Sequence, residues 1–263
     1  MTIKSNLTNY GLHDLSNLNF NFIQKSLKNN FITNDKLCLK FEKQLCKTTG
    51  SKYSVVCNNG TSALMMAILA TNLNKIIAIV PNINFVSVAS IVSLLKGRII
   101  FCDVNENTGM VDFKSFNKIL KLCKKKKIKP NLFIPIHYAG NCLDLNSISQ
   151  SCKKNKIHII EDGCHSFGSR FNKKEVVGSS KKSLCTTFSF HPVKNITTVE
   201  GGAITTNNKK LYLKLIEIRS HSLKRTYQYD PYVLVSPSLN FRMGEINAAL
   251  GIEQLKNLEK LKK

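Results

Sequence analysis

Short apolar runs rich in β-branched residues alternate with segments of helical length through most of the chain. The runs are 53–57, 76–80, 99–103, 132–136 and 157–160, and the segments between them are 61–73, 86–96, 113–127 and 145–155. Such alternation predicts βαβ units and therefore a parallel sheet. Because the runs are apolar throughout, both faces of the sheet are expected to be buried. The predicted fold class is α/β, with a mostly parallel central sheet and helices on both faces.

The remaining segments extend this plan at both ends. Two further strands are predicted at 186–190 and 203–206, with helices at about 208–220 and 243–262. The first 50 residues read as two helices with an Asn-rich joint. We therefore expect a helical N-terminal arm (1–50), one main domain (51–242), and the start of a helix (243–263) that leads toward a C-terminal domain absent from this sequence.

The charge of the chain is high but evenly spread. The formal net charge is +23, and 34 lysines stand against 5 arginines. Nucleic-acid-binding proteins more often concentrate arginine in one stripe with interleaved aromatic residues. No nucleic-acid partner is predicted, although a positive field favours an anionic substrate such as a sugar nucleotide.

Cysteine spacing and hydropathy indicate the cellular compartment in which the protein is expected. The nine cysteines form no CxxC pair, so neither a metal site nor a redox motif is indicated, and a reducing cytoplasm is the expected location. The start of the sequence lacks the apolar stretch of a signal peptide. Residues 76–95 carry no charge, but Pro81, Asn82 and Asn84 interrupt them, so no membrane span is predicted.

The first motif with chemical potential is CNNGTSAL at 57–64, where a predicted strand passes through a Gly-containing turn into a helix. Free amides at a helix N-terminus, together with the Thr61 and Ser62 hydroxyls, form a site suited to phosphate. The alternative is an ordinary helix start, with Thr61 or Ser62 as the N-cap.

The second motif is IIEDGCHS at 159–166, at the end of a predicted buried strand. Sheets of this class place ligand-binding groups at the carboxyl ends of their strands. A desolvated Asp162 facing a protonated pyridine nitrogen would keep that ring cationic. The alternative is that Asp162 caps a following helix and that His165 is a satisfied polar residue.

The third motif is FSFHPVKN at 188–195, in which a single lysine stands in a largely uncharged stretch followed by Gly201 and Gly202. An amine held in an apolar loop loses its proton more readily, which suits imine formation. The alternative is that Lys194 is one more exposed loop lysine.

Taken in order, the segments NNGTSALMMA, VPNINFVSVAS, PIHYAG, IIEDGCHSFGSRF, TTFSFHPVKNITTVEGGAITTN and LNFRMGEINAALGIEQL resemble the DegT/DnrJ/EryC1/StrS sugar aminotransferases. The resemblance spans nearly the whole chain. It implies the fold type I (aspartate aminotransferase) architecture and pyridoxal 5'-phosphate as cofactor. The most similar subgroup is that of C4-aminotransferases acting on UDP-linked 4-keto-6-deoxy-N-acetylhexosamines, as in pseudaminic acid synthesis.

The resemblance implies three catalytic roles. Lys194 would hold the cofactor as a Schiff base and then carry the proton between cofactor and substrate carbons. Asp162 would pair with the pyridine nitrogen, and His165 would lie near the phenolic oxygen. The implied reaction is amino transfer to a nucleotide-linked keto sugar, with glutamate as amino donor.

It also implies the binding residues and an assembly. Phe85 would stack on the cofactor ring, and Asn240 would reach the phosphate of a partner subunit, so a homodimer with shared active sites is expected. The phosphate would be held by Gly60, Thr61, Ser62 and Ser189.

The sequence departs from the family at three places. The C-terminal domain that helps close the substrate pocket is missing. A glycine expected to need an unusual backbone angle is Ser222 in the stretch Arg219–Ser222, and the Gly-rich N-terminal turn reads FITND at 31–35. Two alternatives follow: a truncated, non-catalytic PLP-binding remnant or subunit, and a PLP-dependent sugar dehydratase, in which histidine would replace Lys194.

Overall fold

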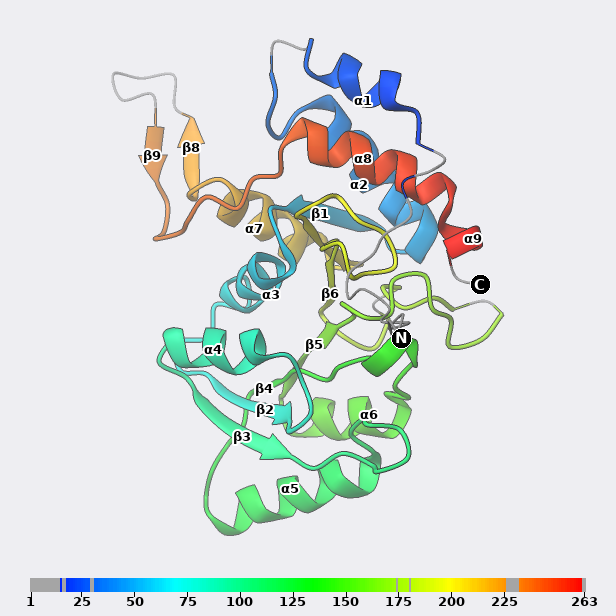
Figure 1. Cartoon of the computed structure of the whole chain (residues 1–263). Helices are drawn as coiled ribbons and strands as arrows, with labels where there is room; N and C mark the ends of the chain where they lie inside the picture. Colours follow the sequence, from blue (N-terminus) through cyan, green and yellow to red (C-terminus); the bar gives the residue numbers. More distant parts are fainter. Residues whose placement is uncertain are drawn as a thin grey trace, which may run out of the picture.

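The computed structural model describes residues 15, 18–28, 31–173, 175–179, 181–225 and 232–261. Its helices follow the predicted segments closely (Figure 1). They are α1 (Phe20–Ser26), α2 (Lys36–Thr49), α3 (Gly60–Leu69), α4 (Val86–Leu94), α5 (Phe113–Lys125), α6 (Asn146–Lys154), α7 (Lys209–Arg219), α8 (Glu245–Lys256) and α9 (Leu258–Leu261). The single predicted helix over 243–262 is therefore two, because α8 ends at Lys256.

The strands form one twisted sheet and one separate hairpin. In chain order they are β1 (Tyr53–Cys57), β2 (Ile77–Pro81), β3 (Arg98–Cys102), β4 (Leu132–Phe133), β5 (His158–Asp162), β6 (Cys185–Ser189), β7 (Gly202–Thr206), β8 (Leu223–Arg225) and β9 (Tyr232–Leu234). β4 is shorter than predicted because Pro135 has no amide hydrogen with which to continue the ladder.

Within the described residues the main sheet has seven strands in the order β1-β7-β6-β5-β4-β2-β3. β7 runs antiparallel to both of its neighbours, and all other pairs are parallel. The predicted mostly parallel α/β fold is confirmed. The strands other than β7 consequently point their carboxyl ends toward the same edge of the sheet.

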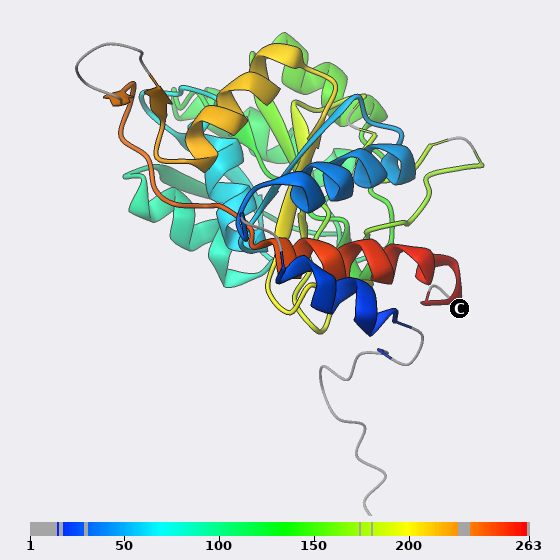
Figure 2. The same cartoon turned by 90° about the horizontal axis from the view of Figure 1, so that it is seen from above.

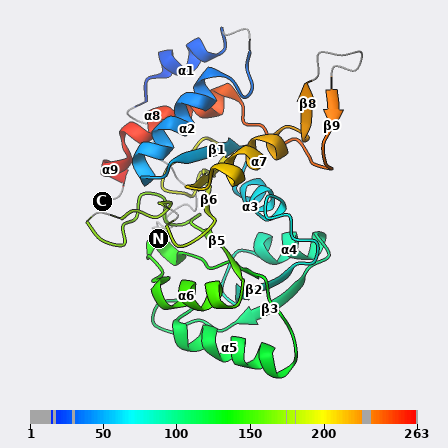
Figure 3. The same cartoon turned by 180° about the vertical axis from the view of Figure 1, so that it is seen from behind.

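Helices cover both faces of this sheet, and the alternation of side chains along each strand explains how. Ala78 and Val80 pack with residues of α3, α4 and α7 on one face. Ile79 faces the other way and packs with residues of α5 and α6. Figure 3 shows α5 and α6 below the sheet in the rear view. The expectation of burial on both faces is wrong for β3, where Arg98 and Phe101 are exposed because β3 is an edge strand.

The third part of the core joins the two ends of the chain. Phe41 and Leu45 of α2 pack with Ala248 and Ile252 of α8 and with strand residues such as Val56. Figure 2 shows α1, α2 and α8 side by side. Most of α8 is buried, so its sequence is not amphipathic in the way a surface helix would be.

Glu245, the first residue of α8, caps α2 from a distance. Its carboxylate accepts hydrogen bonds from the amides of Asp35 (2.8 Å), Leu37 (2.7 Å) and Cys38 (3.1 Å), which are the donors left free at a helix start. The FITND turn is held beside it, since the Asn34 amide donates to the Met243 carbonyl at 3.0 Å. Asn34 adopts the left-handed conformation (φ 52°). Glycine usually occupies this conformation, and asparagine is among the few other residues that adopt it readily.

The hairpin β8–β9 stands away from the body of the molecule (Figures 1 and 3). It follows the Arg219–Ser222 stretch, in which His221 (φ 60°) and Ser222 (φ 52°) both adopt positive φ. The prediction that position 222 needs an unusual backbone angle is confirmed. None of the described helices is long and apolar enough to cross a bilayer.

Candidate functional site

Three turns meet at the carboxyl edge of the sheet. They follow β1, β5 and β6, which lie close together in the strand order, and they carry the three motifs found in the sequence. The turn after β1 starts α3 at Gly60, β5 ends at Asp162, and β6 ends at Ser189 and leads into the loop of Lys194. Parallel strands place their carboxyl ends together, which is why segments over a hundred residues apart share this edge.

The turn after β1 presents free backbone donors. Asn59 is the N-cap of α3, and its side chain accepts the amide of Ser62 at 2.8 Å. The alternative in which Thr61 or Ser62 is the N-cap is therefore wrong. Among the described residues, the amides of Gly60 and Thr61 have no protein acceptor. The positive end of the helix dipole adds to these donors, so this turn suits an anion.

Ser189 lies directly against this helix start. A Cβ atom added to Gly60 would lie 2.6 Å from the Cβ of Ser189, closer than side-chain carbons approach each other. A Cβ on Gly202 would likewise lie 2.3 Å from the Asn59 carbonyl oxygen. Glycine is required at both positions because the end of β6 and the end of the β1–β7 pair close tightly around the helix start.

Asp162 occupies a buried position at the end of β5, with 4% of its surface exposed. Its Oδ1 accepts the amide of Cys164 at 3.0 Å, which makes a turn closed by the aspartate side chain itself. Residues 163–169 form turns rather than a helix. The alternative in which Asp162 caps a following helix is therefore wrong.

His165 and Cys164 belong to the same turn, and the charge of Lys194 shifts the pKa of each. Burial lowers the pKa of His165 below its ordinary value, and the positive charge of Lys194 lowers it further. Burial raises the pKa of the Cys164 thiol well above its ordinary value and the Asp162 carboxylate adds to this effect, whereas Lys194 opposes it. The charge of Lys194 therefore acts on both of these residues of the Asp162 turn.

Lys194 lies in the loop between β6 and β7 and is half-buried. Its amide donates to the His191 carbonyl at 2.9 Å. It is therefore not the fully exposed surface lysine of the alternative. The loop is closed further on, where Asn247 donates through Nδ2 to the carbonyls of Thr198 (2.7 Å) and Glu200 (3.2 Å).

Between those two carbonyls, Val199 adopts φ 68° with 60% of its surface exposed. A β-branched residue in the left-handed region is strained, and such strain persists only where the surroundings impose it. Here the bonds from Asn247 impose it, so the segment beside Lys194 is held rigidly.

Phe85 and Asn240 lie at the same side of the sheet on other elements. Phe85 is the N-cap residue of α4, just beyond β2, and 63% of its surface is exposed, which is high for a phenylalanine. Asn240 is exposed, and its neighbour Phe241 accepts the amide of Asn58 at 3.0 Å. Both are therefore available to a ligand or a partner near the three turns.

The sequence reading missed a buried pair behind Asp162. His137 and Glu161 are 0% and 3% exposed, and the Nε2 of His137 lies 2.7 Å from Oε2 of Glu161. The available signal was a histidine and a glutamate inside the apolar segments PIHYAG and IIED, where a buried polar residue requires a partner.

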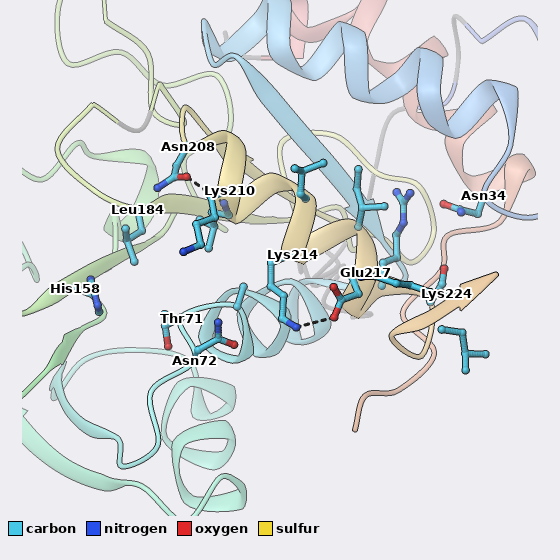
Figure 4. Close-up of a pocket in the computed structure, with 17 residues that line it drawn as sticks. Asn34, Thr71, Asn72, His158, Leu184, Asn208, Lys210, Lys214, Glu217 and Lys224 are labelled. Carbon is cyan, nitrogen blue, oxygen red and sulfur yellow. Dashed lines mark hydrogen bonds and ion pairs between the residues drawn. The ribbon is translucent and has the colours of Figure 1, made fainter. Parts of the chain in front are cut away.

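A separate groove of about 850 Å³ follows α7 along its length, from Asn208 to Ser220 (Figure 4). His158, at the amino end of β5, is part of its wall, as are Lys210 and Lys214. Lys214 pairs with Glu217 at 2.6 Å. None of the predicted site residues lines this groove, so it is distinct from the candidate site.

Comparison with known proteins places this geometry in a family. Residues 14–263 match the model of the DegT/DnrJ/EryC1/StrS aminotransferase family. A UDP-4-amino-4,6-dideoxy-N-acetyl-beta-L-altrosamine transaminase of Campylobacter jejuni is 32% identical over 95% of this chain and 64% of its own length. The corresponding Helicobacter pylori transaminase is 33% identical over 86% of this chain and 58% of its own length. The chain thus spans less than two thirds of the curated relatives it matches.

Solved structures show the same fold. Helicobacter pylori PseC, an aminotransferase involved in the biosynthesis of pseudoaminic acid, superposes with a TM-score of 0.82 at 29% identity, covering 96% of this chain and 66% of that one. A GDP-4-keto-6-deoxymannose-3-dehydratase (ColD) variant superposes equally well, with a TM-score of 0.82 at 28% identity over 96% of this chain and 69% of the dehydratase. The fold alone therefore does not separate amino transfer from dehydration.

Proposed function

The chain belongs to the DegT/DnrJ/EryC1/StrS aminotransferase family, and from that premise we propose that it transfers an amino group to a nucleotide-linked keto sugar with pyridoxal 5'-phosphate as cofactor. The observation that carries the proposal is the meeting of Lys194, Asp162 and the free helix start of α3 at one edge of the sheet. An amine, a buried acid and an anion-binding turn are the three groups that this cofactor requires.

The residues present fit the cofactor. The amides of Gly60 and Thr61, with the hydroxyls of Thr61, Ser62 and Ser189, would hold its phosphate. The tight approach of Gly60 to Ser189 supports a pocket of fixed width. When bound, pyridoxal phosphate supplies an aldehyde that condenses with amines and a ring that accepts electrons from the bond being broken.

The remaining roles fall to groups on the three turns. Asp162, buried and fixed by the Cys164 amide, would face the ring nitrogen and keep its proton in place. Lys194 would hold the cofactor through Nζ and then, once free, move a proton through Nζ between a carbon of the substrate and a carbon of the cofactor. His165 would lie near the phenolic oxygen, and its lowered pKa favours a neutral imidazole there.

The substrate follows from the relatives and from charge. The curated relatives are named as transaminases of a UDP-linked amino sugar, which supports a 4-keto-6-deoxyhexosamine nucleotide, used in making surface glycans. The net charge of +23 favours such an anionic substrate. Glutamate is proposed as the amino donor.

An assembly and a compartment complete the proposal. We propose a homodimer with shared sites, in which Phe85 stacks on the cofactor ring and Asn240 reaches the phosphate held by the partner. Both side chains are exposed, which supports contact beyond their own chain. All nine cysteines are unpaired, which supports a cytoplasmic, reducing location.

A sugar dehydratase is the second candidate, because ColD shares the fold at a similar identity. The residue at position 194 favours amino transfer, since histidine would replace the lysine in the dehydratase. The test is incubation of the PLP-loaded protein with glutamate and a panel of UDP- and dTDP-linked keto sugars, followed by measuring 2-oxoglutarate release. Release with one sugar supports amino transfer, whereas a deoxygenated sugar product supports dehydration. A bound cofactor with no turnover across the panel supports a non-catalytic, PLP-binding protein.

A further inference from the structure

The buried pair His137–Glu161 lies directly behind the turn that carries Asp162 and His165. Glu161 and Asp162 are consecutive in β5, so their side chains leave opposite faces of the sheet. Asp162 is thus directed away from the pair, and His137 lies among buried residues with the ring of Phe171 edge-on at 5.5 Å. The pair does not share a face with Asp162, so it is not itself a reacting group.

The hydrogen bonds fix the protonation state of His137. Its Nδ1 accepts the amide of Leu143 at 3.0 Å, so Nδ1 carries no proton. The proton must be on Nε2, which donates to Oε2 of Glu161 at 2.7 Å. Both ring nitrogens of His137 are therefore engaged in hydrogen bonds.

Glu161 is bound on its other side as well. Its Oε1 accepts the hydroxyl of Ser183 and, at 3.4 Å, that of Thr186. Among the described residues no lysine or arginine lies within ion-pair distance of this carboxylate. The carboxylate is therefore held by directed hydrogen bonds from neutral groups, an arrangement that specifies geometry.

The backbone of His137 transmits that geometry to the turn. Its amide donates to the Asp162 carbonyl at 3.0 Å, and its carbonyl accepts the hydroxyl of Ser166 at 2.8 Å. These two hydrogen bonds hold the turn at its first residue, Asp162, and at its last, Ser166. The next residue, Tyr138, places its ring 6.0 Å from that of His165.

We propose that His137 and Glu161 are positioning residues, which hold the turn 162–166 in the shape that presents Asp162 and His165 to the pyridine ring of the cofactor. This inference rests on the proposed function for its ligand. The restraint that His137 places on the turn 162–166 does not depend on a ligand, so it can be measured in protein without cofactor.

The experiment compares two substitutions of His137, each of which keeps one of the two hydrogen-bonding positions of the imidazole. His137→Gln retains a donor where Nε2 lies, so it can still bond Glu161. His137→Asn retains an acceptor near Nδ1 for the Leu143 amide, but it cannot reach Glu161. Phe116→Leu, at a buried position of α5 itself, serves as a control for a general loss of stability, which is followed by thermal melting.

The first readout is hydrogen exchange of the peptide covering 162–169, in protein without cofactor. We expect the Asn variant to exchange about tenfold to hundredfold faster, as loss of one hydrogen bond to a charged group implies. The Gln variant and the Phe116→Leu control should stay close to the unaltered protein. Unchanged exchange in the Asn variant, or equally fast exchange in the Gln variant, overturns the proposal.

The second readout is the affinity for pyridoxal phosphate, titrated by near-violet absorbance. The Asn variant should bind about tenfold or more weakly, as is found when outer-shell partners of a ligand are removed, and the Gln variant should bind like the unaltered protein. Equal affinity in all three proteins overturns the positioning role. If the turn loosens as expected but the unaltered protein shows no violet band, the proposed function fails while the hold on the turn stands.

Discussion

The two edges of the sheet contain different kinds of residue. The amino edge borders the α7 groove, where lysines are plentiful and the Lys214–Glu217 pair is partly exposed. The carboxyl edge holds half-buried Lys194, buried Asp162 and the start of α3, whose first amides have no acceptor among the described residues. The comparison teaches that burial and hydrogen-bonded position, rather than the number of charges, mark the site.

The largest effect should come from exchanging a lysine at each edge. Lys194→Ala should remove the violet absorbance band and all borohydride-dependent labelling by pyridoxal phosphate, because the reacting amine is gone. Lys210→Ala, at the groove, should leave both unchanged. Peptide mass spectrometry after reduction locates the label, and labelling of Lys210 in place of Lys194 would reverse the assignment of the two edges.

Glycine contacts offer a second comparison. Gly60→Ala would force a Cβ to 2.6 Å from Ser189, and Gly97→Ala, before β3 at the amino edge, would force one to 2.8 Å from Val92. Both should lower the free energy of unfolding by about 1–3 kcal/mol, the usual cost of overpacking. Only Gly60→Ala should also weaken cofactor binding, by about tenfold or more, since each 1.4 kcal/mol is a factor of ten. Equal affinities in the two folded variants would argue against a phosphate site at α3.

Val199 tests whether the loop beside Lys194 is strained. Val199→Gly should raise the free energy of unfolding by about 0.5–1 kcal/mol, because glycine takes φ 68° freely and the left-handed penalty outweighs the added chain entropy. Val86→Gly is a matched control, since Val86 is equally exposed but helical, and it should lose stability. Denaturant unfolding measures both. A lower free energy of unfolding for Val199→Gly as well would show that the loop carries no strain.

The smallest effect concerns pH. The pKa of His165 is lowered in the folded protein, so below the ordinary histidine value of about 6.5 the unfolded chain binds more protons. The stabilisation that depends on neutral His165 is therefore present above that value and is lost as the pH falls. The unaltered protein should lose more stability than His165→Gln between neutral and mildly acidic pH, in unfolding curves recorded at each pH. Parallel losses would mean that His165 is not linked to folding.

The sequence predicted the sheet well where local pattern and burial agree. β1 occupies the predicted run 53–57, and the run 186–190 is displaced by one residue. The antiparallel direction of β7 and the exposed edge position of β3 depend on strand order, which no local pattern encodes. The β8–β9 hairpin was not predicted, because each strand has only three residues and β9 is exposed throughout, so no alternation marks it.

The candidate site was predictable as motifs but not as geometry. Lys194, Asp162 and the Gly60 turn stand out by residue type and position in their motifs, and the family resemblance assigned their roles. The N-cap bond of Asn59 is local, but Thr61 and Ser62 suit the same role by residue type. The bonds from His137 to both ends of the Asp162 turn come from contacts between distant segments. Such contacts depend on the finished packing, so they could be read only from the structure.

The cap that Glu245 gives to α2 joins positions about two hundred residues apart, and among the described strands β1 pairs with β7 alone, which also comes late in the chain. During synthesis α2 and β1 emerge long before Glu245 and β7 exist. α2 and β1 contact each other early, through Glu42, but their cap and their strand partner are added only after the later residues have left the ribosome. A chaperone that shields nascent chains would have its longest task at this end of the protein.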